Sequence, residues 1–134
     1  MLKTSTLATQ DLEVAHMRIT YVEDNVANIA LLERICQMSK DDLITYLDAD
    51  TALTEIGVGT SDLIIIDLHL GTKATDGLQL SRALRDNGVT EPIIAITSYD
   101  HLFRDHYLEA GCDEYIRKPV SVETFLATID HYRA

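Results

Sequence analysis

Short apolar runs alternate with amphipathic helical patterns along most of the chain. The runs that predict strands are RITYV (18–22), LITYL (43–47), DLIIID (62–67), PIIAIT (92–97) and EYIRK (114–118). Helical periodicity predicts helices over 25–39, 51–56, 77–86 and 100–110, and a last helix that Ser121 caps. The second helix is about one turn short. This alternation indicates an α/β domain with a mainly parallel sheet, in which 62–67 is a central strand buried on both faces.

Length and charge narrow the class of protein. The 134 residues suit one domain, which we place at 18–134 behind an N-terminal arm at 1–17. The formal net charge of −11 opposes direct binding to nucleic acid or to an anionic membrane surface. No signal peptide or transmembrane run is visible, so we expect a cytoplasmic protein. The last predicted helix reaches the C-terminus, so we expect no output domain after it.

Cysteine and histidine usage does not indicate a metal site. Cys36 and Cys112 have no ligand spacing, and we interpret both as apolar packing residues in a reducing compartment. Four of the histidines also share no ligand spacing and are interpreted as surface residues: His16, His101, His106 and His131. A zinc site is therefore not expected.

Chemically active residues follow the predicted strands. In an open parallel sheet, ligands bind beyond the carboxyl ends of the strands. Glu23 and Asp24 follow the first strand, and Asp67, Thr97 and Lys118 end the third, fourth and fifth. Clustered carboxylates favour Mg²⁺, and a carboxylate can attack phosphorus to give an aspartyl-phosphate. A lysine and a hydroxyl provide the positioning and charge neutralisation that phosphoryl transfer needs.

These residues lie in segments that resemble the receiver domains of two-component response regulators, especially single-domain receivers and those of hybrid histidine kinases. The segments are YVEDN (21–25), LIIIDLHL (63–70), DGLQLSRALR (76–85), PIIAITS (92–98) and AGCDEYIRKPVSVETFL (110–126). The resemblance covers 18 to about 133. It implies a doubly wound, flavodoxin-like sheet of five parallel strands in the order 2-1-3-4-5, flanked by five helices.

The resemblance also implies residue roles. Asp67 would accept the phosphoryl group, Lys118 would bridge Asp67 and that group, and Pro119 would follow a cis peptide bond. Thr97 would move towards the phosphoryl oxygen, and Tyr115 would swing inward after it. Mg²⁺ would be held by Asp24 and Asp67 directly, by Glu23 through water, and by the backbone carbonyl of His69.

The family implies partners as well. A sensor histidine kinase or a histidine phosphotransfer protein would donate the phosphoryl group, and a downstream protein of unknown identity would respond. On a helical wheel, Val26, Ile29, Leu32 and Cys36 share one arc, whereas Leu31 and Ile35 point away from it. We therefore expect Leu31 and Asn28 to form a docking patch, unless a neighbouring element covers this side. A homodimer through the fourth helix, fifth strand and fifth helix stays open.

Two departures from the family pattern concern the phosphorylation site. The loop after Asp67 is longer than usual and has Gly71 where proline is common. His69 and Tyr99 occupy positions that tune attack by water on the aspartyl-phosphate, and both are bulky. We predict slow self-dephosphorylation for that reason.

Three other functions are alternatives to this phosphorylation switch. A haloacid-dehalogenase-like phosphatase would need a second aspartate where His69 stands, and a flavodoxin-like redox protein would need a phosphate loop that VEDNVAN (22–28) does not provide. A pseudo-receiver, a binding module that takes no phosphate, is the remaining alternative. On the favoured interpretation the protein is not an enzyme, because it catalyses only its own phosphorylation and dephosphorylation.

Overall fold

A five-stranded parallel sheet forms the centre of the computed structural model, which describes residues 16–70, 75–98 and 104–133. The strands are β1 (Arg18–Val22), β2 (Asp42–Tyr46), β3 (Leu63–Asp67), β4 (Ile93–Thr97) and β5 (Glu114–Arg117). Their order is β2-β1-β3-β4-β5, and every neighbouring pair is parallel. The predicted α/β fold and strand order are confirmed.

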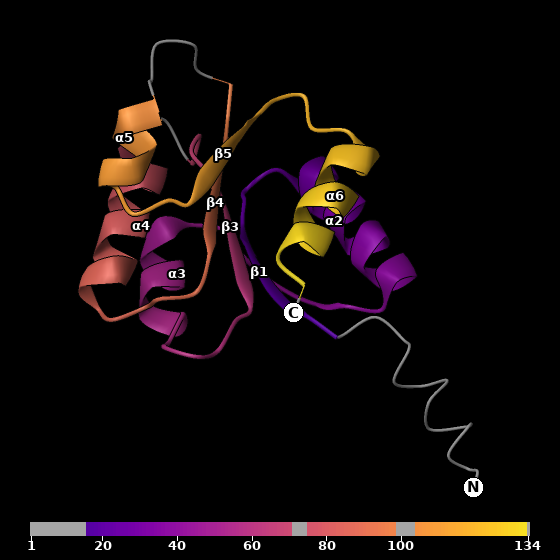
Figure 1. The fold of residues 1–134 in the computed structure, drawn as a ribbon, viewed down its shortest axis with the longest axis horizontal. Helices are drawn as coiled ribbons and strands as arrows, with labels where there is room; N and C mark the ends of the chain where they lie inside the picture. The colour runs from indigo at the N-terminus through magenta and orange to yellow at the C-terminus, as the bar shows by residue number, and fades with distance from the viewer. Residues whose placement is uncertain (1–15, 71–74, 99–103, 134) are drawn as a thin grey trace, which may run out of the picture.

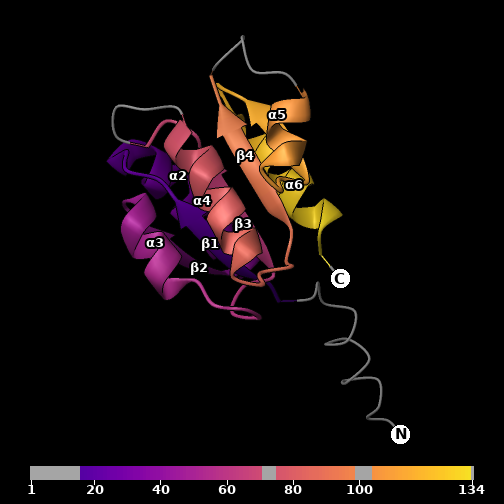
Figure 2. The same ribbon diagram turned by 90° about the vertical axis from the view of Figure 1, so that its left-hand side faces the viewer.

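Helices cover both faces of the sheet (Figure 1). One layer holds α2 (Val26–Ser39) and α6 (Val122–His131). The other layer holds α3 (Ala49–Glu55), α4 (Thr75–Asp86) and α5 (Arg104–Glu109), which lie in front of the sheet in Figure 2. The five helices of the described residues thus divide two to three, as in a doubly wound fold.

The apolar run of β3 explains its central place. Successive side chains of a strand point to opposite faces, so both faces of β3 must be apolar if helices cover both. Ile64 and Ile66 belong to the core cluster that also contains residues of α3, α4 and α5, whereas Leu63 and Ile65 belong to the cluster shared with α2 and α6. All five β3 residues are buried, while the edge strands β2 and β5 are only partly buried.

Two helices begin earlier than predicted. The α3 helix begins at Ala49 rather than at residue 51, because the Asp48 side chain caps it by accepting a hydrogen bond from the Thr51 amide. The α4 helix begins at Thr75 rather than at Gly77. A Cβ at Gly77 would lie 2.7 Å from the Leu68 Cα, so glycine lets α4 pack directly against the chain that leaves β3. The predicted Ser121 cap of the last helix is present.

The buried face of α2 differs from the predicted arc. Ile35 was expected to point away from the core, but it is only 1% exposed and packs with Leu32 and Cys36. Val26 was expected on the core side, but it is 78% exposed. The error has a geometric cause: the helix turns a face centred between Leu32 and Ile35 towards the sheet, and Val26 in its first turn lies almost opposite that face.

The packed domain begins close to the predicted boundary with the N-terminal arm. Met17 is buried and its amide donates to the Asp41 carboxylate, so the packed domain reaches at least to this residue. The rest of the predicted arm, residues 1–15, lies outside the described residues.

Cys36 and Cys112 are buried and unpaired, in different core clusters, as their interpretation as packing residues requires. Within the described ranges, no helix has the length and apolarity needed to cross a membrane.

Candidate functional site

The predicted site residues meet at the carboxyl edge of the sheet because their strands are parallel neighbours. Asp67 is the last residue of β3, and Thr97 is the last residue of β4 beside it. Glu23 follows β1 on one side, and Lys118 follows β5 on the other. Four segments far apart in the sequence thereby contribute to one polar site.

Asp67 is the buried centre of this site, with an exposed fraction of 0%. Its Oδ1 accepts a hydrogen bond of 2.7 Å from the backbone amide of His69. Lys118 Nζ lies 2.5 Å from Oδ2 and forms an ion pair with it. The charge of this buried oxygen is therefore balanced by one ammonium group rather than by a set of backbone and side-chain hydrogen bonds.

The position of Lys118 is fixed by the backbone. Its amide donates to the Thr97 carbonyl at 2.8 Å, which continues the pairing of β5 with β4. The Lys118–Pro119 peptide bond is cis, as the resemblance implies. The side chain is 27% exposed, so the ammonium group bridges the buried carboxylate and the solvent.

Glu23 is the second buried carboxylate of the site. Its Oε1 accepts hydrogen bonds from the Tyr21 hydroxyl and the side-chain amide of Asn28, each 3.0 Å long. Its Oε2 accepts a hydrogen bond from the Asp24 backbone amide. Burial, followed by the neighbouring Asp67 carboxyl, raises the pKa of Glu23 to about 7. Two carboxyl groups this close repel when both are ionised, and a bound cation would relieve that repulsion.

The site offers few protein ligands for such a cation. Across residues 16–70, 75–98 and 104–133, no three carboxylate, histidine or cysteine side chains lie close enough to hold a metal ion. Mg²⁺ does not require three, since it commonly binds one or two carboxylates and completes its shell with water, carbonyl and phosphate oxygens. The hard oxygen donors of Glu23 and Asp67, next to the exposed Asp24, fit that ion.

The predicted switch residues lie on the β4–β5 side of the site. Thr97 is fully buried, whereas the Tyr115 ring is 38% exposed on the surface. Tyr107 of α5 is buried between this surface and the interior, and its ring stacks on Tyr115 with centroids 4.3 Å apart. Tyr107 was not identified from the sequence, because its segment RDHYLE (104–109) is polar apart from Leu108 and carries no apolar stripe.

The predicted docking residues border a groove beside the site. Asn28 and Leu31 line a hollow of about 390 Å³ together with Lys118, Pro119 and Phe125. Leu31 is half-buried and packs against the α2–α6 core cluster, so the predicted patch is a groove wall rather than an isolated exposed side chain. Asn28 has a further contact that was not predicted, its hydrogen bond to Glu23.

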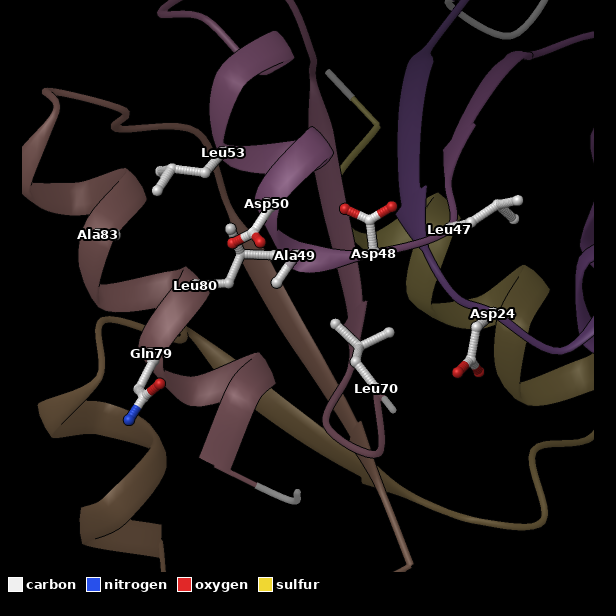
Figure 3. A pocket seen from close by; sticks show the side chains of 10 residues that line it. All are labelled: Asp24, Leu47, Asp48, Ala49, Asp50, Leu53, Leu70, Gln79, Leu80 and Ala83. Atoms are coloured by element: carbon white, nitrogen blue, oxygen red, sulfur yellow. The ribbon is translucent and has the colours of Figure 1, made fainter. Parts of the chain in front are cut away.

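A second hollow opens on the other side of Asp24. It measures about 570 Å³ and lies between α3 and α4, with Leu53, Leu70 and Leu80 among its apolar lining. Figure 3 shows Asp24 at one end of this cleft and Leu53 towards the other. Solvent therefore reaches Asp24 through this cleft between α3 and α4.

Comparison with known families agrees with this arrangement. Residues 19–130 match the response regulator receiver domain, and the chain belongs to that family.

Two curated relatives show how the chain compares with whole proteins. The transcriptional regulatory protein CiaR of Streptococcus pneumoniae is 32% identical over 110 residues, which cover 80% of this chain and 47% of CiaR. The polar-differentiation response regulator DivK of Brucella anthropi is 30% identical over 117 residues, covering 85% of this chain and 94% of DivK. The chain thus spans about half of the first relative and nearly all of the second.

Two solved structures have the same fold. The beryllofluoride-activated N-terminal receiver domain of Klebsiella pneumoniae RstA gives a TM-score of 0.75 at 28% identity, covering 86% of this chain and 97% of that one. The receiver domain of Saccharomyces cerevisiae Ssk1, solved with the histidine phosphotransfer protein Ypd1, gives a TM-score of 0.76 at 23% identity, covering 90% of each chain.

Proposed function

We propose that the protein is a phosphorylation switch whose Asp67 accepts a phosphoryl group from a sensor histidine kinase or a histidine phosphotransfer protein. The observation that carries this proposal is the buried Asp67 Oδ2, which forms an ion pair with Lys118 Nζ at 2.5 Å and has the buried Glu23 carboxyl as its neighbour. A structural carboxylate would be saturated with hydrogen bonds, whereas a nucleophile needs an available oxygen. In the proposed function the chain acts only on itself and controls a downstream protein.

The reaction follows from the charges around Asp67. A carboxylate oxygen attacks the phosphorus, and the new O–P bond forms as the bond to the donor breaks. With a phosphohistidine donor, the electron pair of the broken bond returns to the imidazole nitrogen. Lys118 supplies positive charge where the phosphoryl oxygens would lie, and the hydroxyl of Thr97, which is buried at the end of the neighbouring strand, would donate a hydrogen bond to one of them.

Mg²⁺ would be held by Asp24, Asp67 and the His69 carbonyl, with Glu23 acting through water. When bound, the ion would neutralise charge on the carboxylates and on the phosphoryl oxygens. Glu23 is oriented for this role by its hydrogen bonds to the Tyr21 hydroxyl, the Asn28 amide and the Asp24 backbone. The His69 amide donates to Asp67 Oδ1 and orients the nucleophile.

The groove beside Lys118 suits the proposed donor. Histidine-containing donors present their reactive side chain on a helix, and an amphipathic helix can bind in an apolar groove. Leu31, Pro119 and Phe125 provide apolar lining, and Lys118 lies in the same lining, so a docked helix would bring its histidine near Asp67. The complex of Ssk1 with Ypd1 is a precedent for a phosphotransfer protein bound to this fold. A cytoplasmic location is proposed with this role, supported by the two unpaired cysteines.

Labelling with acetyl phosphate tests the proposal without a partner. We expect the wild-type protein to gain one phosphoryl group in the presence of Mg²⁺, measured by intact mass, and to lose labelling when EDTA is added. Asp67→Asn should abolish labelling, whereas Asp50→Asn, which neutralises an exposed carboxylate of the nearby cleft, should be labelled like the wild type. An unlabelled wild type would identify a pseudo-receiver, and a labelled Asp67→Asn protein would assign the phosphate to another residue.

A further inference from the structure

Two tyrosines form a stacked pair between the phosphorylation site and the surface. Tyr107 comes from α5 and Tyr115 from β5. Their ring centroids are 4.3 Å apart and their planes differ by 14°, so the rings are almost parallel. Tyr107 is the inner member, with an exposed fraction of 1%, and Tyr115 is the outer member. Any movement of one ring must therefore be accommodated by the other.

The inner tyrosine has its hydroxyl next to Thr97. The buried Tyr107 Oη has no hydrogen bond of good geometry to any described residue. Buried tyrosine hydroxyls usually have one, because desolvation without a partner is costly. The Thr97 side chain offers a weaker hydrogen-bonding contact: burial raises the pKa of Tyr107, and the hydrogen bond with Thr97 opposes that rise. The Tyr107 hydroxyl is thus poised beside the residue expected to move on phosphorylation.

The stacking also limits how Tyr115 can move. The inward swing that the family resemblance implies would bring its ring towards Thr97, but the Tyr107 ring lies against its face at 4.3 Å. A hollow of about 150 Å³ touches both rings, and the exposed Arg104 and Leu108 contribute to its lining. An inward movement of Tyr115 would therefore displace Tyr107 or separate the two stacked rings.

We propose that Tyr107 is a positioning residue that couples Thr97 to Tyr115. Its hydroxyl responds to the orientation of Thr97, and its ring passes that change to Tyr115 through the stack. The outcome is a changed α5–β5 surface, formed here by Tyr115 and the exposed Leu108. This inference rests on the proposed phosphorylation of Asp67, and it assigns the route by which that event reaches the surface.

Fluorine NMR of the protein labelled with 3-fluorotyrosine can test this coupling. The chain has six tyrosines and no tryptophan, so Tyr→Phe substitutions assign each resonance. With Mg²⁺ and beryllofluoride as the phosphoryl mimic, we expect the Tyr107 and Tyr115 resonances of the wild type to shift together. In Tyr107→Phe, which keeps the ring but lacks the hydroxyl, the Tyr115 shift should fall by at least half. The matched variant Tyr46→Phe, at the last residue of β2, should retain the full Tyr115 response.

Acetyl-phosphate labelling of the same variants separates the two proposals. Tyr107→Phe should be labelled at the wild-type rate, because Tyr107 contacts neither Asp67 nor Lys118 in any described interaction. If the wild type is labelled but Tyr115 does not respond, or responds fully in Tyr107→Phe, the coupling role of Tyr107 is wrong while phosphorylation stands. If the wild type is not labelled, the proposed function itself is wrong.

Discussion

Two buried aspartates, each paired with a cation, differ in how completely they are satisfied. The Asp41 carboxylate accepts hydrogen bonds from the Met17 amide, the Ser39 hydroxyl and both terminal nitrogens of Arg133. The Asp67 carboxylate has one hydrogen bond, to Oδ1, and an ion pair at Oδ2. Both side chains are completely buried, so burial alone does not distinguish them.

The difference indicates what each pair contributes. A planar guanidinium that binds both oxygens fixes a carboxylate in place, whereas an ammonium group is a point charge that can be shared with another ligand. The Asp41–Arg133 pair joins the loop before β2 to the end of α6 and leaves no oxygen for other partners. The Asp67–Lys118 pair leaves room for reaction. We infer that the first pair stabilises the fold and the second supports the chemistry.

The largest effect is expected from Arg133→Ala. Removing one partner of a buried ion pair leaves an uncompensated charge, and the loss is about 3–5 kcal/mol. We expect the free energy of unfolding in urea to fall by that amount, because Arg133 has a side chain only 8% exposed and contacts a completely buried carboxylate. The double variant Arg133→Met, Asp41→Asn should recover part of the loss. A change below about 1 kcal/mol in the single variant would contradict the structural role.

Lys118→Met should slow phosphorylation strongly and lower the stability of the fold only slightly. We expect acetyl-phosphate labelling to slow about 100-fold, a barrier increase of about 2.7 kcal/mol, because the positive charge beside Asp67 Oδ2 is lost. Stability should change much less than in Arg133→Ala, because the Lys118 side chain is 27% exposed whereas that of Arg133 is 8% exposed, so water can replace more of the lost interaction. Loss of stability without slowed labelling would show that the two ion pairs have the same role. Labelling rates and urea unfolding curves for both variants provide the comparison.

Leu31→Asp tests the groove that surrounds the reactive pair. A carboxylate in the wall beside Phe125 and Lys118 should disfavour an apolar partner helix, and we expect phosphotransfer to slow about 10-fold, or about 1.4 kcal/mol. Labelling by acetyl phosphate should stay at the wild-type rate, because the small donor does not need the groove. Val26→Asp, at an exposed position of the same helix, is the matched control. Equal losses with both donors would show that the substitution damages the site rather than docking.

Acidification should produce the smallest effect, and it should come from Asp41. Burial would raise the pKa of Asp41, but the hydrogen bonds from Arg133, Ser39 and the Met17 amide outweigh it and lower the pKa below its usual 3.8. A carboxyl group with a lowered folded-state pKa stabilises the fold above its unfolded-state pKa, and this contribution is lost as the pH falls through the folded-state value. We therefore expect about 1 kcal/mol more loss below pH 4 in the wild type than in Asp41→Asn. If the free energy of unfolding falls equally with pH in the two proteins, the predicted contribution of Asp41 is wrong.

The contrast between the Asp67–Lys118 and Asp41–Arg133 pairs also explains which contacts could be predicted from the sequence. Asp67, Glu23 and Lys118 were predicted to meet because each follows an apolar strand, and parallel strands bring their carboxyl ends to one edge. The Asp41–Arg133 pair was not predicted. Its residues are 92 positions apart, and no strand or helix periodicity relates them. Only the packing of α6 against α2 brings them together.

The error on α2 has a related origin. Helical periodicity gives the angular spacing of Val26, Ile35 and Leu31, but the rotation of the helix against the sheet depends on what packs beside it. Here α6 lies next to α2 and extends the covered face over Ile35 and part of Leu31. Tyr107 was missed for a comparable reason, since its burial comes from tertiary packing in the core cluster with Leu80 and Leu84 rather than from an apolar pattern in its own segment.

The bonds of Asp41 have a consequence for protein engineering. Its Oδ1 accepts from the Met17 amide at 3.0 Å and from Arg133 at 2.7 Å, so both ends of the described chain meet at one carboxylate. This meeting point lies at the amino edge of the parallel sheet, whereas Asp67 lies at the carboxyl edge. A reporter fused directly before Met17 or after Arg133 would lie on the side away from the reactive aspartate. A linker between these two residues would equally permit a circular permutant, with new termini cut into the exposed turn at Gly59.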